Sequence, residues 1–119
     1  PSRCHELHRA RPAAPRGRAA LGRSARAWGN DCVARLRIGH WASAEASCLE
    51  GLTIATEAKT KGALLYNLGR IAEAQGAQAQ ALEHYRSSLA ARPDDRTVKR
   101  RLAKLERAVA RAAADPRTP

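Results

Sequence analysis

Apolar residues recur along the chain at helical spacing in five separate stretches. In the last of these, positions 98, 102, 105 and 109 are apolar, which are intervals of four, three and four residues. This spacing is typical of one face of an α-helix rather than of a strand. The pattern predicts helices over residues 24–38, 41–58, 63–75, 78–91 and 96–113.

Short breaks separate the expected helices. Residues 39–40 end the first helix, residues 59–62 form a connector after the second, and Gly76 ends the third, as glycine commonly does. Residues 92–95 stop the fourth helix, and an aspartate there can cap the fifth. Five helices joined by such short breaks predict antiparallel helix pairs.

The composition favours the same all-α class. Hydrophobic residues make up 44% of the 119 residues, but 27 of them are alanine, aromatic residues contribute 3%, and Phe and Met are absent. Alanine, leucine and arginine are good helix formers, whereas strand formers are scarce. A wide sheet is therefore excluded, and closely packed helices are expected. No apolar run approaches the roughly 20 residues of a membrane span, so no transmembrane segment is expected.

The net charge of +11 lies at the two ends of the chain. Residues 1–23 carry +5 and residues 96–119 carry +6, so the body is close to neutral. We expect residues 1–23 to form a flexible basic tail and residues 115–119 to be disordered. The cluster at residues 4–8 (Cys-His-Glu-Leu-His) has no fourth ligand nearby, so neither a metal nor another cofactor is expected.

The chain contains an internal repeat. Gly39 is followed at offsets 5, 9 and 13 by Ala44, Cys48 and Leu52, and Gly76 is followed at the same offsets by Ala81, Tyr85 and Leu89. The two sets are 37 residues apart. A period of this length is typical of stacked helical repeats.

Residues 62–95 resemble one unit of the tetratricopeptide repeat family, in the Ala- and Arg-rich form found in bacteria. The matching positions are Leu65, Leu68, Gly69, Ala72, Gly76, Ala81, Tyr85 and Pro93. The resemblance implies that the small Gly69 and Ala81 let two antiparallel helices close up, while leucines and Tyr85 fill the space between them. Pro93 ends the second helix of the unit.

The resemblance weakens outside this unit. Residues 24–61 form a degenerate copy, with Asp31 where a leucine is expected, Cys32 where the contact glycine stands and Thr56 where the proline should be. Residues 96–114 are expected to be an amphipathic basic capping helix. The implied architecture is a short α-solenoid of two helix pairs and an end helix, in which each unit buries its apolar face against a neighbour.

The family resemblance implies a non-catalytic scaffold or adaptor that binds a peptide or helix of another protein in a concave groove. The first helix of each pair would line it with Arg26, Asn30, Tyr66, Asn67, Arg70, Arg100, Arg101 and Lys104. Such a groove is basic, so an acidic ligand is expected. The family's clamp for a terminal carboxylate is not expected, because Gly29, Val33 and Thr97 replace its Lys, Asn and Lys.

Two alternatives compete with this hypothesis. The charges of the last helix can simply solvate the end of the array, and Asn67 can be a structural polar contact. The basic tail and last helix can also bind nucleic acid or an anionic membrane nonspecifically, although four aromatic residues leave few platforms for stacking bases. An enzyme is not expected, because no phosphate-binding glycine loop or catalytic constellation is present.

The repeat register implies that Cys32 and Cys48 face one another across the first helix pair. Their Cα separation is then expected within the range of about 4.4–6.8 Å that disulfides require. They are either reduced thiols that serve as small buried residues or a disulfide. A cytoplasmic location is the default expectation, and an oxidised pair would indicate a periplasmic or exported protein.

Overall fold

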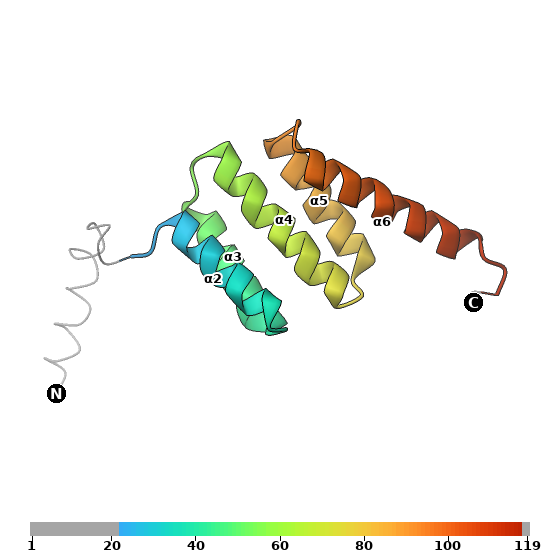
Figure 1. Ribbon diagram of the computed structural model, residues 1–119, viewed down its shortest axis with the longest axis horizontal. Coiled ribbons are helices and arrows are strands. Elements are labelled where there is room, and N and C mark those ends of the chain that lie inside the picture. Colours follow the sequence, from blue (N-terminus) through green and yellow to red (C-terminus); the bar gives the residue numbers. More distant parts are fainter. Residues whose placement is uncertain (1–21, 118–119) are drawn as a thin grey trace, which may run out of the picture.

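The computed structural model describes residues 22–117, and these residues form an all-helical structure (Figure 1). Five helices account for 80% of this part of the chain, which contains no strand. They are α2 (Ala25–Arg37), α3 (Trp41–Ile54), α4 (Ala58–Ala74), α5 (Gln78–Ala91) and α6 (Arg96–Ala114). The all-α prediction is confirmed. No helix in residues 22–117 has both the length and the apolar character that crossing a membrane would require.

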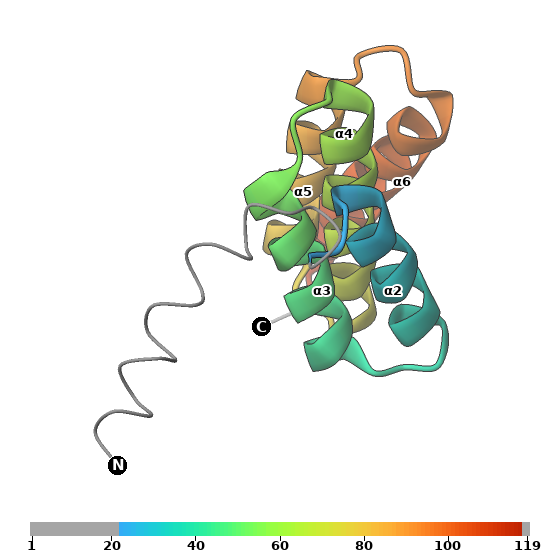
Figure 2. The same ribbon diagram turned by 90° about the vertical axis from the view of Figure 1, so that its left-hand side faces the viewer.

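Successive helices pack against one another in chain order (Figure 1). The most extensive contacts join α4 to α5 and α2 to α3, so the helices form two pairs. Helix α4 also contacts both helices of the first pair, and α6 packs on α5. Viewed from the end, α2 and α6 lie toward one side and α3 and α5 toward the other (Figure 2).

The turns inside the two pairs have the same backbone geometry. Gly39 and Gly76 adopt left-handed φ values of 81° and 80°. In the first turn, the amides of Gly39 and His40 donate to the carbonyls of Leu36 and Arg35, and the equivalent amides after α4 do the same. This is the Schellman arrangement, in which glycine takes the left-handed position without a steric penalty. The 37-residue repeat in the sequence is therefore a repeat in backbone structure.

The prediction for the segment between the two pairs is wrong. Helix α3 ends at Ile54 rather than at residue 58, and residues 59–62 belong to α4, which starts at Ala58. The break falls at residues 55–57, next to β-branched residues that favour helices weakly. Gly62 suggested a connector, but it is buried inside α4, where an added Cβ atom would lie 2.9 Å from Cγ of Arg92. The glycine makes room for a side chain and does not break the helix.

Helix α6 begins at the predicted cap. The carboxylate of Asp95 accepts a hydrogen bond of 3.2 Å from the amide of Val98, which confirms that the aspartate ends the turn and caps the helix. Val98 and Leu105 are buried against α5. On the solvent side, Arg86 of α5 forms an exposed ion pair of 3.1 Å with Glu106.

The second pair closes around Tyr85, whose side chain is fully buried. Its ring lies directly over Gly69, where an added Cβ atom would overlap Cδ1 and Cε1 and lie 3.0 Å from Cζ. The hydroxyl donates a 2.7 Å hydrogen bond to Oε1 of Glu73. Burial first, and then this bond to Glu73, raise the pKa of Tyr85 well above its ordinary value. Ala81, also fully buried, leaves space for the same close approach.

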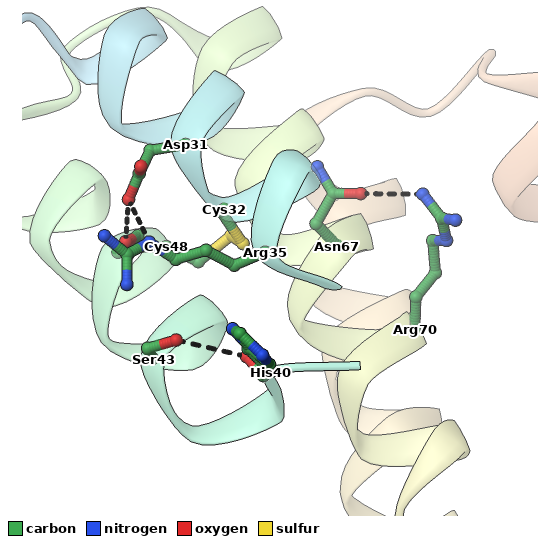
Figure 3. Close-up of a disulfide and its surroundings, with 9 residues drawn as sticks. Asp31, Cys32, Arg35, His40, Ser43, Cys48, Asn67 and Arg70 are labelled. Atoms are coloured by element: carbon green, nitrogen blue, oxygen red, sulfur yellow. Dashed lines mark hydrogen bonds and ion pairs between the residues drawn. A yellow bond between two sulfur atoms is a disulfide. The ribbon is translucent and has the colours of Figure 1, made fainter. Parts of the chain in front are cut away.

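A disulfide occupies the equivalent position in the first pair (Figure 3). Cys32 and Cys48 precede Gly69 and Tyr85 by 37 residues each, so one covalent bond stands where the glycine-to-tyrosine contact stands in the second pair. Their Cα atoms are 5.4 Å apart, within the range that disulfides require. Both side chains are 0% exposed.

Asp31 organises polar contacts beside the disulfide (Figure 3). Its Oδ2 atom accepts hydrogen bonds from the Ser47 hydroxyl and, at 2.8 Å, from Nε of Arg35, and it lies 3.8 Å from Arg23. The bond from Ser47 holds the pKa of Asp31 below its ordinary value of 3.8, with help from both arginines and against a smaller opposing effect of burial. This carboxylate takes the place of the leucine that the repeat pattern leads one to expect.

We expect Gly69→Ala to destabilise the protein. The added methyl group meets the rigid Tyr85 ring, and overpacking of this kind costs roughly 1–3 kcal/mol. Gly29→Ala is the matched control, because its methyl group meets a single side-chain end, Cδ2 of Leu64, at 3.3 Å. A small shift of that flexible side chain accommodates it, and the helix propensity of alanine, about 0.5–1 kcal/mol better than glycine, offsets the cost. Urea unfolding measures both. Equal stability of the two variants would contradict the tight Gly69 contact.

We expect one free thiol per chain in unreduced, denatured protein, and mapping should assign it to Cys4. Closing a loop across a separation of 16 residues stabilises a protein by roughly 3 kcal/mol in the chain-entropy description. Reduction should therefore lower the melting temperature of the wild type and leave a Cys32→Ala/Cys48→Ala variant unchanged. Three free thiols in the unreduced wild type would show that the bond is absent.

The Asp31 contacts predict a contribution to stability that depends on pH. Since the pKa of Asp31 is lower in the folded protein than in the unfolded chain, the contribution is fully present above pH 3.8 and is lost as the pH falls below that value. The gap in urea midpoint between the wild type and Asp31→Asn should be wider near pH ~6 than near pH ~3. A gap that does not change with pH would contradict this role.

Candidate functional site

A hollow in the surface lies between Tyr66, on one flank of α4, and one face of α6. This hollow, which we call the α4–α6 hollow, has a volume of about 500 Å³. It is lined by Tyr66, Thr97, Arg100, Arg101, Ala103, Lys104 and Arg107. Six of these seven residues belong to α6, so the end helix supplies most of the wall.

The amphipathic pattern of α6 explains why cations gather there. Arg100, Lys104 and Arg107 are spaced by four and three residues and share one face of the helix, opposite the apolar stripe that packs on α5. Four cationic side chains and no carboxylate line the hollow. Within residues 22–117 none of these four side chains forms an ion pair. The hollow is therefore a region of positive potential.

A second hollow lies on the other flank of α4. This α2–α4 hollow has a volume of about 280 Å³. It is lined by Ala25, Arg26, Gly29, Asn30, Val33, Glu57, Lys59, Thr60, Ala63, Leu64 and Asn67. Asn30 and Asn67 occupy equivalent positions in the two pairs, 37 residues apart. The lining combines small and branched apolar side chains with two amides and charges of both signs.

Three neighbouring residues on α4 form the ridge between the hollows. Tyr66 lines one hollow and Asn67 the other. The Arg70 guanidinium lies 5.8 Å from the centroid of the Tyr66 ring and donates a 3.2 Å hydrogen bond to Oδ1 of Asn67 (Figure 3). Asn67 is only 7% exposed, so this bond satisfies a buried oxygen and orients the arginine. The guanidinium is thereby held at the boundary of the two hollows by neutral groups.

The eight residues that the sequence proposed for partner binding all lie on α2, α4 and α6. Arg26, Asn30 and Asn67 line the α2–α4 hollow, and Tyr66, Arg100, Arg101 and Lys104 line the α4–α6 hollow. Arg70 lines neither and lies on the ridge. The structure thus gathers the eight positions around α4, while their role in binding stays a prediction.

The sequence analysis did not identify several of the residues that line the two hollows. Lys59 and Thr60 were assigned to a connector, although both line the α2–α4 hollow from the first turn of α4. If the sequence analysis had started this helix at residue 58, it would have put Lys59 and Thr60 on the helix face that lines the α2–α4 hollow. Arg107 was not among the proposed binding residues, but its spacing from Arg100 and Lys104 puts it on the same face of α6 as those two residues.

Other candidate chemistry is sparse in the part of the chain that the structure describes. Among residues 22–117, no three His, Cys, Asp or Glu side chains are placed to hold a metal ion. The cluster at residues 4–8 and most of the expected basic tail lie outside the described residues. The comparisons with protein-family models, curated proteins and solved structures found no match for this chain.

Proposed function

We propose that this protein is a non-catalytic interaction module that holds an acidic segment of another protein. The bound segment lies across α2, α4 and α6 and places its carboxylates in the α4–α6 hollow. The architecture that serves this function is a short tetratricopeptide-type α-solenoid, in which α2–α3 and α4–α5 are the repeated pairs and α6 is the capping helix.

The repeated backbone supports the solenoid assignment. The two pairs share their Schellman turns, their 37-residue spacing and the position of a close contact between their helices. Each pair contacts its neighbour in chain order, as stacked repeats do. The first helices of the pairs and α6 then provide the surface on which the two hollows lie.

The four cations of the α4–α6 hollow carry the proposal of an acidic ligand. Arg100, Arg101, Lys104 and Arg107 lie within two turns of one helix and form no ion pair within the described residues. Like charges this close repel one another, and a carboxylate-bearing ligand relieves that repulsion. Arginine adds bidentate hydrogen bonds to carboxylates, which fix the position of the ligand as well as its charge.

Nonspecific binding of a polyanion is the second candidate, favoured by the charge of +6 on residues 96–119. Tyr66 is the one aromatic residue in either hollow, so stacking contacts for bases are few. The two candidates differ in salt dependence. Polyanion binding falls steeply with salt because counterions are released, whereas a segment seated in a groove retains packing and hydrogen bonds.

We expect Arg70→Glu/Arg101→Glu to weaken binding of a short fluorescent acidic peptide by roughly tenfold or more, equal to about 1.4 kcal/mol. Arg101 lines the α4–α6 hollow and Arg70 lies on the ridge beside it, so the reversed charges repel carboxylates there. The matched control, Lys61→Glu/Lys99→Glu, makes the same change in net charge at exposed positions outside both hollows. Fluorescence anisotropy measures affinity, and circular dichroism verifies that helicity is unchanged.

Equal losses in the two variants would refute the groove and indicate an effect of net charge alone. Duplex DNA of matched charge serves as the second ligand. If the DNA binds more tightly than the peptide, and both lose affinity with salt at the slope expected for counterion release, the polyanion function is the correct one.

A further inference from the structure

The two hollows differ in chemistry, and from this difference we infer the kind of segment that the protein recognises. The segment is extended, places an uncharged apolar side chain in the α2–α4 hollow, and places two acidic side chains, themselves about two residues apart, in the α4–α6 hollow beginning about four residues away. This inference rests on the proposed function and specifies its ligand.

The α2–α4 hollow suits an apolar side chain. Its lining includes Ala25, Val33 and Ala63, which are not fully buried and give it an apolar surface. Glu57 offsets only one of the two cations there, Arg26 and Lys59, so this lining has a net charge of +1, against +4 in the α4–α6 hollow. The carboxylate of Glu57 also repels an acidic side chain. Burial of a leucine-sized group in such a site is favourable because it removes apolar surface from water.

The α4–α6 hollow suits the opposite chemistry. Every charged residue in its lining is a cation, and its volume of about 500 Å³ exceeds the 280 Å³ of the α2–α4 hollow. More than one carboxylate is needed to balance four cations. A ligand with a single acidic residue would leave most of the repulsion among these cations in place.

The position of α4 sets the distance between the two groups on the ligand. Tyr66 and Asn67 are consecutive, so they point about 100° apart around the helix and place the hollows on its two flanks. A chain that crosses the face of a helix about 10–12 Å wide needs roughly three to four extended residues at about 3.3 Å each. Because side chains alternate between the two sides of an extended chain, the residue four positions away is the one that points to the same side. A helical ligand brings side chains four residues apart to within about 5–6 Å, too near to occupy both hollows.

Synthetic peptides with blocked termini test this inference. One peptide carries a leucine four residues before the first acidic residue of an Asp-x-Glu pattern, a second carries it four residues after the last acidic residue, and each has a counterpart with serine in place of leucine. We expect the wild type to bind at least one leucine peptide roughly fivefold or more tightly than its serine counterpart, because the leucine buries apolar surface. Anisotropy titrations at several salt concentrations give the affinities.

Two variants separate the hollows. Ala63→Leu fills the α2–α4 hollow from an exposed helical position, and it should abolish the preference for leucine without changing the salt dependence. Lys104→Glu should weaken leucine and serine peptides alike and reduce the salt dependence. Ala46→Leu, at an exposed position of α3 outside both hollows, is the control for the added side chain and should retain the preference.

The failure of this inference is distinguishable from that of the proposed function. Equal binding of leucine and serine peptides by the wild type, or a preference that survives Ala63→Leu, overturns the apolar subsite and leaves the acidic groove standing. If no blocked acidic peptide binds, or if Lys104→Glu has no effect, the groove itself is not the binding site and both proposals fall.

Discussion

A close contact at one repeat position joins the two helices of each pair, and the rest of the structure depends on it. In the second pair Gly69 lies against the ring of the buried Tyr85, and in the first pair Cys32 is bonded to Cys48 at the same repeat position. The second pair is held together by the close fit of the Tyr85 ring against Gly69, and the first pair by a covalent bond. Both solutions satisfy one constraint, since a larger side chain at either point would separate helices that have few large apolar residues to fill the gap.

The same contacts position the candidate groove. With Tyr85 fixed beneath α4, the side of α4 that carries Tyr66 and Arg70 faces outward, and the two tyrosine rings remain 5.9 Å apart. In the first pair, the disulfide fixes the helix that supplies Arg26 and Asn30. Groups that are held in place by such contacts lose little freedom when a ligand binds, which favours affinity.

Much of the fold could be predicted because its signals are local. Helical periodicity, the glycines at 39 and 76 and the cap at Asp95 each act within a few residues. The prediction at Gly62 was wrong because this glycine is needed for a contact with Arg92, which is thirty residues away in sequence. Helix propensity, which is a local property, gives no information about that contact. For the same reason the hollows could not be foreseen in full: Lys59 and Thr60 reach one only because α4 begins earlier than the glycine suggested.

If the protein binds an acidic segment as proposed, helix α6 would link its stability to that binding. Its one extensive contact is with α5, through the stripe that includes Val98 and Leu105, while the rest of its surface carries the four cations that line the α4–α6 hollow. Repulsion among these cations opposes the helix, and the exposed pair between Arg86 and Glu106 offsets little of it. A ligand that contacts both Tyr66 of α4 and the cations of α6 can bind only when α6 is packed on α5. Its binding free energy would therefore add to the stability of this packing. Helix α6, which packs extensively against one other helix alone, is thus the helix that an acidic partner of the proposed kind would stabilise most.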